Sequence, residues 1–229
     1  MALTATCAAM SIGPAAEASP FADNETVRYV IKKLKMKVGE AKITFRGEAE
    51  LNHRKVYLIV FRAEGFRFFD QEKIYVDPVS FLPVQVERDV DIFGKKEKIT
   101  EYYGPAGKVR IVKIAGGKRN EQVIVKDGPI ENIYGFIYRY RLQGSFAIGS
   151  SLKMSLPTKD VTMKVVEPQT VKAGGQKYKA YFLESDPNQY RIWFDAGPGR
   201  IPLRIDGAVG FGDTAMVMEE YHPGKIHPQ

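Results

Sequence analysis

Apolar and polar residues alternate along most of this chain, and turns containing Gly, Pro or Asn interrupt the alternation about every eight to twelve residues. The first such stretch, VRYVIKKLKMKVGEAKITFRGEAEL, begins at Val27. Because successive side chains of a strand point to opposite faces, a period of two predicts strands with one buried face. The sequence therefore predicts a mainly β, antiparallel protein with a curved or barrel-like sheet.

The same alternation predicts the positions of the strands and turns. Within the first stretch, the Val-Gly-Glu sequence predicts a turn between two strands at Gly39. Further strands are expected at residues 55–62, 66–69, 73–76, 83–92, 98–103, 108–114, 121–126, 161–166, 177–184, 190–194, 202–205 and 214–221. Clear turn signals lie at residues 115–118, 127–129, 173–175 and 186–188.

One segment, DGPIENIYGFIYRYRLQ at residues 127–143, departs from this period. Its apolar residues recur at helical spacing, with Asp127 as a candidate N-cap and Pro129 near the first turn. An alternating, strand-like reading of the same residues also exists. The spacing favours one short helix near residues 129–142, which would plug the open side or an end of a barrel.

Two distant stretches share one layout: IYVDPVSFLPVQVERDVDIFGKKEKITEYYGPAGK at 74–108 and IWFDAGPGRIPLRIDGAVGFGDTAMVMEEYHPGK at 192–225. Both read as a strand ending in Asp, a turn, a strand begun by Pro, a Gly, and a strand ending in Glu-Tyr. The predicted turn positions are Asp77 and Pro83 in the first stretch and Asp195, Pro202 and Gly212 in the second, and Gly94 matches Gly212 in the alignment of the two. Proline is tolerated where a strand starts. The echo therefore indicates a repeated hairpin geometry rather than a duplicated site.

Composition and charge bound the class of protein. The chain of 229 residues is 44% hydrophobic and 27% charged, as expected for a soluble globular domain. We expect one β-rich domain at residues 27–222 and a disordered tail at 223–229. The net charge of +7 permits anionic partners, but acidic residues are mixed among the basic ones, as in KKEK. This pattern favours a solvated basic face and no nucleic-acid partner.

Residues 1–26 are expected to be a signal-peptide remnant or a disordered tail. Ala16-Glu17-Ala18 fits the small-x-small cleavage pattern of a secretory signal, with Ser19 as the first mature residue. A secretory signal begins with a positively charged region, but this chain has no Lys or Arg before Arg28. We therefore expect that translation begins upstream of Met1. These features predict a periplasmic or otherwise exported protein. No later stretch approaches the roughly 18 consecutive apolar residues of a membrane span.

Motifs for catalysis, metals or cofactors do not occur in a supporting context. The letters GFGDTA at 210–215 resemble a dinucleotide fingerprint, but a strand rather than a helix follows them. His53, His222 and His227 assemble neither a triad nor a metal set, and the single cysteine, Cys7, excludes a Cys-based metal site. We expect no catalytic residue, metal or cofactor. A hydrolase would require two carboxylates that converge in one cleft.

A binding role is better supported. A sheet curved into a barrel encloses a cavity that can receive an apolar or lipid-like ligand. The aromatic candidates for its lining are Tyr134, Phe136, Tyr138, Phe182, Trp193 and Phe194. The plainer alternative for each residue is that it fills the core. The alternative for the whole protein is a scaffolding module that binds envelope proteins through a sheet edge or a surface patch.

Short motifs resemble the DUF3108 family of exported bacterial proteins. They are Tyr29 with VGEA at 38–41, Asp77-Pro78 before Leu82-Pro83, residues 127–141, and IWF at 192–194 before RIPLR at 200–204. The resemblance spans Val27 to about Tyr221. It implies an envelope location and a β-rich fold, and it supplies no catalytic residue. A more distant similarity is to lipoprotein-carrier and lipoprotein-sorting half-barrels, which hold an acyl chain against helices.

Overall fold

The computed structural model describes residues 19–209 and 214–225. Fifteen strands form one antiparallel sheet in the order β8-β7-β6-β5-β4-β3-β2-β1-β15-β14-β13-β12-β10-β9, and β11 pairs with β12 off this path. The sheet is not closed, since β8 and β9 are its edges. The predicted class, a mainly β and curved antiparallel sheet with one short helix, is confirmed.

The first half of the chain is a meander of consecutive hairpins. Its strands are β1 (Glu25–Lys33), β2 (Met36–Leu51), β3 (Arg54–Gly65), β4 (Phe68–Val76), β5 (Pro83–Ile92), β6 (Lys95–Gly104), β7 (Lys108–Ala115) and β8 (Lys118–Val125). Residues 66–69 and 73–76 therefore do not form separate strands, because the turn lies at Phe66 and Arg67 and β4 runs without a break from Phe68.

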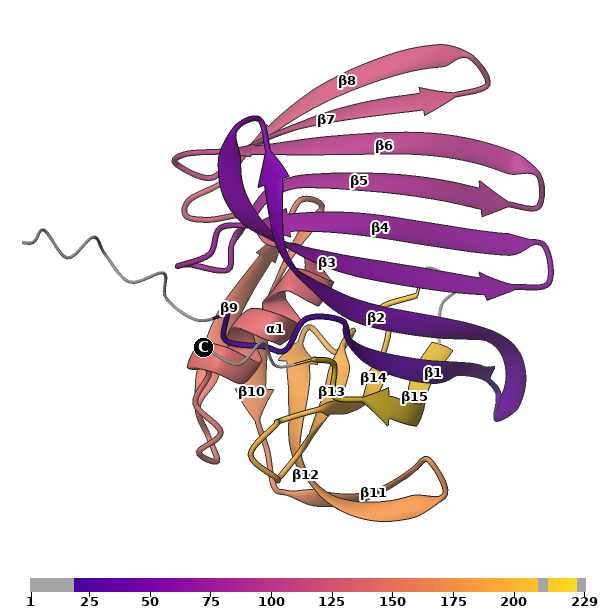
Figure 1. Cartoon of the computed structure of the whole chain (residues 1–229), viewed down its shortest axis with the longest axis vertical. Coiled ribbons are helices and arrows are strands. Elements are labelled where there is room, and N and C mark those ends of the chain that lie inside the picture. Colours follow the sequence, from indigo (N-terminus) through magenta and orange to yellow (C-terminus); the bar gives the residue numbers. More distant parts are fainter. Residues whose placement is uncertain (1–18, 210–213, 226–229) are drawn as a thin grey trace, which may run out of the picture.

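The second half follows the helix α1 (Ile133–Gln143). Its strands are β9 (Ser151–Leu156), β10 (Lys159–Val165), β11 (Gln169–Ala173), β12 (Gln176–Asp186), β13 (Arg191–Asp195), β14 (Pro202–Asp206) and β15 (Thr214–His222). The last strand, β15, pairs with β1, so the first and last strands join the two halves into one sheet (Figure 1).

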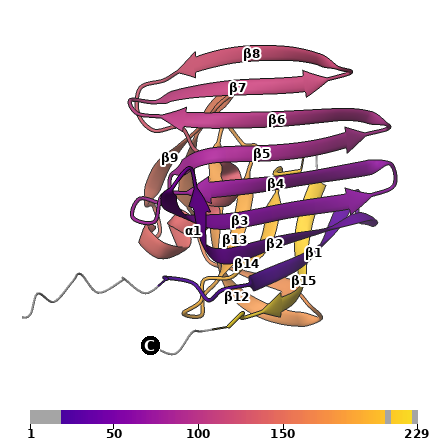
Figure 2. The same cartoon turned by 45° about the horizontal axis from the view of Figure 1, so that its top comes forward.

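The sheet curves around α1, which lies behind the β1–β8 layer in Figure 2. Phe61 of β3 stacks on Tyr134 of α1 with ring centroids 3.9 Å apart, and Phe194 of β13 stacks on Tyr140 at 5.8 Å. Because these contacts come from opposite halves of the sheet, the helix fills the space between them. We call the face toward α1 the inner face and the opposite one the outer face.

The helix begins later than the sequence pattern predicts. Its N-cap is Asn132, whose side-chain oxygen accepts hydrogen bonds from two N–H groups of the first turn at 2.9 and 3.3 Å. Asp127 is therefore not the cap. The preceding Glu131 is held outside the helix because its N–H donates to the Ser155 carbonyl of β9 at 2.6 Å. A neighbouring strand thus determined where the helix starts.

The first turn of the meander also differs from the prediction. It lies at Leu34 and Lys35, whose φ angles of 49° and 69° suit a two-residue hairpin turn. Gly39 lies inside β2 opposite Gly65, where an added Cβ would come within 2.5 Å of the Glu64 carbonyl oxygen. The glycine at 39 therefore permits a close approach of two backbones rather than a turn.

The two echoed stretches form the same kind of hairpin. Pro83 begins β5 and lies opposite Val76 of β4, and Pro202 begins β14 and lies opposite Phe194 of β13. In each pair the register shifts, as at a β-bulge, just before the residue that faces the proline. The echo therefore reflects one bulged, proline-started geometry built twice. Of the other turn positions, Asp77 lies directly after β4, Asp195 ends β13, and Gly212 lies outside the described residues.

The folded part extends beyond the expected limits of 27 and 222. Phe21 packs edge-on against Phe45 and Tyr138 in the core, with ring centroids 5.4 and 5.1 Å away. At the other end, the Lys225 N–H donates to the Asp23 carbonyl at 2.8 Å. Residues 19–26 and 223–225 therefore belong to the fold. The expected cleavage pattern at residues 16–18 lies outside the described residues.

Gly135 in the middle of α1 is a position where an added carbon is tolerated. A Cβ there would lie 3.7 and 3.8 Å from methyl groups of Val76 and Ile74, which is ordinary contact. Since Ala favours a helix over Gly, we expect Gly135→Ala to raise the free energy of unfolding by about 0.5–1 kcal/mol. Urea denaturation measures the change.

The matched control is Gly107→Ala in the turn before β7. Gly107 has a φ of +69°, and a Cβ there would lie 2.1 Å from the Lys126 carbonyl oxygen. We expect this variant to lower the free energy of unfolding by more than about 1 kcal/mol. A loss of stability in Gly135→Ala would show that the α1 packing cannot take even a methyl group.

Candidate functional site

The six aromatic residues predicted to line a cavity divide between the two faces of the sheet. Four lie in the inner core, where each is at most 1% exposed: Tyr134, Phe136, Tyr138 and Phe194. Phe182 and Trp193 lie on the outer face, directly opposite each other on β12 and β13, with ring centroids 4.7 Å apart. The structure therefore brings four candidates together as core packing and places two elsewhere.

Strand alternation explains why Trp193 faces outward. In the β13 sequence RIWFD, Phe194 packs on α1, so its neighbour Trp193 and, two residues before it, Arg191 share the outer face. The register of β14 then places Arg204 opposite Trp193 and Asp206 opposite Arg191. An aromatic ring and three charged groups thus meet on one patch of the outer face.

The β11–β12 hairpin folds back over this patch (Figure 1). At its tip the Gly174 N–H donates to the Met218 carbonyl of β15 at 2.8 Å. Along β11 the Gln169 side-chain oxygen accepts a hydrogen bond from the Trp193 indole N–H, also at 2.8 Å. These two bonds hold β11 as a local second layer, and Trp193 is only 6% exposed beneath it.

A pocket of about 620 Å³ lies between this second layer and the outer face. Its walls come from the β1–β2 hairpin, β11, the segment before β13, and β13 to β15. The apolar part of the lining is formed by Leu34, Val171, Trp193, Ala215 and Val217. The volume falls in the range of small-molecule sites.

Cationic groups dominate the polar part of this pocket. The lining contains five cationic side chains and one carboxylate: Lys32, Lys35, Lys172, Arg191, Arg204 and Asp206. The buried Asp206 accepts hydrogen bonds from Arg204 Nε and Nη2 at 2.7 and 2.9 Å and contacts Arg191 at 3.1 Å. Arg204 also lies over the Trp193 ring, 4.7 Å from its centroid. The carboxylate therefore holds both guanidinium groups in place.

The lysines of the pocket are differently placed. Within residues 19–209 and 214–225, no carboxylate or other side-chain partner binds the ammonium groups of Lys32, Lys35 and Lys172. All three side chains are exposed. Unpaired ammonium groups beside fixed guanidinium groups and an aromatic wall are suited to hold an anion that has an apolar part.

The sequence contained part of the signal for this site. The alternation in RIWFD already places Arg191 and Trp193 on one face of a strand. The lysines had no such signal, because they reach the pocket from three separate places: Lys32 from β1, Lys35 from the β1–β2 turn and Lys172 from β11. The strand β11 was not predicted, and it is only five residues long.

Two carboxylates also converge on the inner face. Asp70 and Glu72 of β4 are 3% and 7% exposed, and both face Arg88 of β5. Arg88 Nε lies 2.7 Å from Asp70 Oδ1 and 3.4 Å from Glu72 Oε1. Burial raises the pKa of Glu72 to about 7, against the opposing effect of the Arg88 charge. A hydrolase would require two carboxylates that converge in a cleft. Asp70 and Glu72 do converge, but they are packed in the interior.

The Glu72 carboxylate has a structural partner in the helix. It accepts a hydrogen bond from the side-chain amide of Asn132, the N-cap of α1, at 2.8 Å. Beside it, Glu131 pairs with Arg139 at 2.6 Å along a smaller hollow of about 340 Å³. These contacts bind the start of α1 to β4, which supports an anchoring role for this network.

Among residues 19–209 and 214–225, no helix has the length and apolar character needed to cross a bilayer. No curated protein sequence matches this chain.

Three solved structures are similar to this one. A beta-barrel-like protein of the domain of unknown function DUF1849 from Brucella abortus has a TM-score of 0.48 and 10% identity, covering 90% of this chain and 99% of that one. A protein inferred to be exported, with a YmcC-like fold, from Bacteroides fragilis has a TM-score of 0.32 and 6% identity, covering 90% and 98%. A protein inferred to be a lipoprotein, from Parabacteroides distasonis, has a TM-score of 0.28 and 8% identity, covering 90% and 99%. At these scores the likenesses carry no conclusion about function.

A family profile gives a direct assignment. The profile of the family described as "Protein of unknown function (DUF3108)" matches residues 26–219. The match runs from β1 to β15 and includes α1 and the whole lining of the outer-face pocket. Because it covers most of the chain, this protein belongs to the DUF3108 family.

Proposed function

We propose that this protein is a non-catalytic binding protein of the cell envelope, and that its ligand is an anionic amphiphile held in the outer-face pocket. The observation that carries the proposal is the lining of that pocket, where lysines that have no side-chain partner among residues 19–209 and 214–225 lie around the wall formed by Trp193. The proposed ligand class is lipid-like, as in the sequence analysis. The proposed binding site is the outer-face pocket and not a cavity inside the barrel, because aromatic side chains fill the inner face. The cleavage pattern at residues 16–18 supports the envelope location.

The two parts of the lining select the two parts of such a ligand. A carboxylate or phosphate head would lie between Lys172 on β11 and Lys35 on the β1–β2 hairpin, where it neutralises charges that now repel each other. An apolar body would cover Trp193 and Val217, removing their remaining apolar surface from water. A neutral ligand would gain only the free energy of burying apolar surface, without the charge attraction.

Trp193 is the single tryptophan of the chain, so its fluorescence reports directly on the pocket. We expect octyl phosphate, titrated below its micelle concentration, to change the emission saturably. Octyl glucoside, which has the same tail and no charge, should bind more weakly. Lys172→Glu should weaken octyl phosphate binding about ten-fold, since it replaces an attraction with a repulsion.

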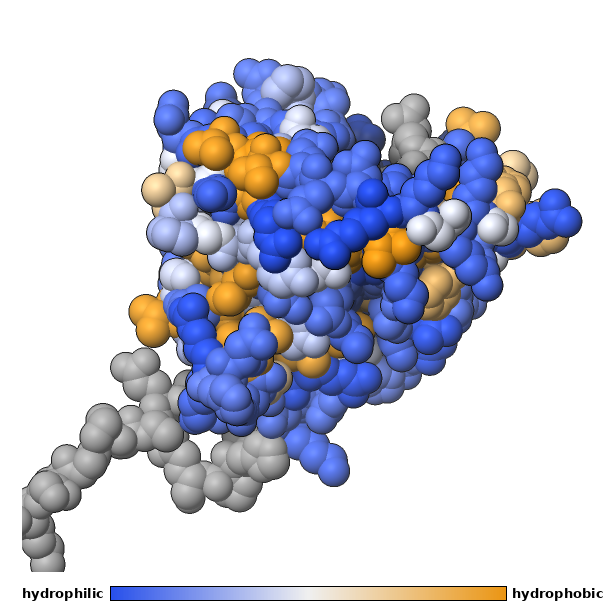
Figure 3. All heavy atoms as spheres, turned by 90° about the horizontal axis from the view of Figure 1, so that it is seen from above, coloured by the Kyte–Doolittle hydropathy of each residue, from blue (hydrophilic) through white to orange (hydrophobic). Residues whose placement is uncertain are grey.

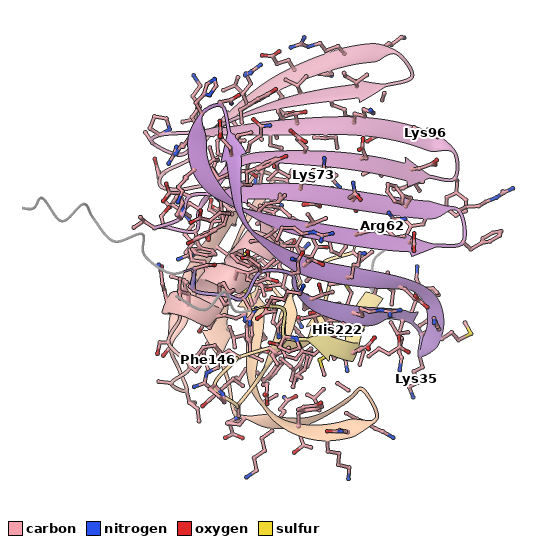
Figure 4. The ribbon with its side chains drawn as sticks, in the orientation of Figure 1. Lys35, Arg62, Lys73, Lys96, Phe146 and His222 are labelled. Carbon is pink, nitrogen blue, oxygen red and sulfur yellow. The ribbon has the colours of Figure 1, made fainter. Side chains whose placement is uncertain are left out.

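Lys73→Glu is the matched control. Lys73 is an exposed lysine in the middle of β4, away from the pocket (Figure 4). This variant should bind octyl phosphate like the unmodified protein. Unchanged Trp193 emission, or equal weakening by both variants, would contradict the proposal. The scaffolding alternative would then be preferred, with the exposed edge strand β8 as its site.

A further inference from the structure

Alternate turns of the β1–β8 meander lie at one end of the sheet (Figure 1). They connect β1 to β2, β3 to β4, β5 to β6 and β7 to β8. Each turn carries a large apolar side chain in water at or beside its tip. The exposed fractions are 81% for Leu34, 83% for Phe66, 64% for Phe93 and 45% for Ile114. We call these four turns the apolar-basic tips.

In each of these tips a cation comes after the apolar residue, directly in the first two, two residues later in the third and four residues later in the fourth. The four exposed cations are Lys35, Arg67, Lys95 and Lys118. Lys35 and Lys96 are seen at this end of the sheet in Figure 4. In the view from the β8 side, apolar residues project among hydrophilic ones at the same end (Figure 3). The pairing of apolar and basic groups therefore repeats across the whole end of the meander.

The tips are held in place by their own backbone. Arg67 and Phe93 have φ angles of 54° and 53°, as the tight turns require. The Phe93 N–H donates to the Arg67 carbonyl at 2.8 Å, which joins two neighbouring tips. Because the turns lie beyond the ends of the paired strands, Phe66 and Phe93 cannot reach the core. Their apolar surface stays in water unless something covers it.

The opposite end of the same meander has a different character. Its three turns contain Asn52 and His53, the segment from Asp77 to Leu82, and Pro105 with Ala106. Among the described residues of these turns, Val79 is the one large apolar side chain that is mostly exposed. Both ends consist of hairpin turns of one sheet, so turn formation alone does not account for the apolar-basic tips.

We propose that the apolar-basic tips dock on a bilayer surface that carries anionic phospholipid head groups. Phe66 and Phe93 would enter the interfacial layer, while Arg67 and Lys95 would remain at the level of the phosphates. Apolar side chains backed by cations are the combination that binds such an interface, because burial and charge attraction act together. The tip with Leu34 and Lys35 also lines the proposed pocket. The test therefore changes only the tips with Phe66 and Phe93, which lie outside the pocket lining, so failure of this inference and failure of the pocket function can be told apart.

Co-sedimentation of the full chain with vesicles tests the inference. We expect binding to mixed phosphatidylcholine–phosphatidylglycerol vesicles and much weaker binding to phosphatidylcholine alone. Arg67→Glu with Lys95→Glu should lower the partition coefficient more than ten-fold, since each cation contributes roughly five-fold near an anionic surface. Phe66→Ser with Phe93→Ser should lower it about ten-fold. Added salt should weaken binding of the unmodified protein.

Val79→Ser at the opposite end is the matched control, and it should not change binding. All of these side chains are exposed, so we expect each variant to fold, and circular dichroism checks this. Equal binding to both kinds of vesicle would overturn the inference, as would unchanged binding of the Phe66→Ser, Phe93→Ser variant. A smaller apparent size of that variant on gel filtration, without any vesicle effect, would instead assign the tips to contacts between copies of this chain.

Discussion

Replacing Arg141 with Met is expected to lower the free energy of unfolding by about 3–5 kcal/mol. Arg141 in the last turn of α1 donates to both carboxylate oxygens of Glu25 on β1, at 2.6 and 3.0 Å. The two side chains are only 2% and 6% exposed. The Arg141→Met variant would leave the Glu25 carboxylate buried without its cation. It would also leave the Gly199 carbonyl without the two hydrogen bonds that Arg141 donates.

Arg28→Met provides the matched control. Arg28 also pairs with a glutamate across strands, Glu220 of β15 at 3.2 Å, but these side chains are 49% and 46% exposed. Water screens this pair, so its loss should cost about 0–1 kcal/mol. Chemical denaturation at neutral pH measures both variants. If the two changes are equal, the buried pair does not hold α1 against β1.

The combination of Glu25→Gln with Arg141→Met tests the cause of the loss. If an uncompensated buried charge causes the destabilisation, the double variant should be more stable than Arg141→Met alone. If the double variant is less stable, packing of the arginine against the rings of Phe21 and Tyr138 accounts for the effect instead.

The second large effect is a dependence of stability on pH that arises from Glu72. Burial raises the pKa of Glu72 from its ordinary 4.5 to about 7 in the folded protein. Between these two values the folded chain keeps a proton that the unfolded chain has released. The free energy of unfolding therefore falls as the pH rises through this range, by about 3 kcal/mol from this group, and is then constant above it.

Glu72→Gln isolates this contribution. The glutamine keeps an oxygen for the Asn132 amide but has no proton to lose, so the fall in stability between about pH 5 and 7 should become smaller by roughly the same 3 kcal/mol. At pH 8 the variant should be more stable than the unmodified protein. Urea denaturation across the pH range measures the difference.

Glu40→Gln is the control for this titration. The exposed Glu40 accepts a hydrogen bond from Lys37, which lowers its pKa, so its replacement cannot flatten a fall in stability with rising pH. The raised pKa of buried Glu131 leaves a remaining slope in every variant. A pH profile of Glu72→Gln identical to that of the unmodified protein would show that the Glu72 proton does not contribute.

Local patterns predicted much of the strand arrangement. Residues 83–92 match β5 at both ends, and residues 108–114 and 214–221 each end one residue before the corresponding strand does. Each segment alternates regularly and is bounded by a proline, a glycine or a two-residue turn, so neighbours along the chain set its conformation. The failures at Gly39 and Asp127 arose where a distant partner decided the geometry, namely the backbone of Gly65 and that of Ser155.

The sequence by itself therefore determined a curved antiparallel sheet, two proline-started hairpins and a short central helix, because period, turn chemistry and strand bulges are local properties. Strand alternation in RIWFD also puts Trp193 and Phe194 on opposite faces, although both were expected to line one cavity. Only the tertiary structure decided which of them faces the helix, because that depends on β15 pairing with β1 across almost the whole chain. The same non-local pairing brings Lys35 beside β11 and gives the pocket its charge.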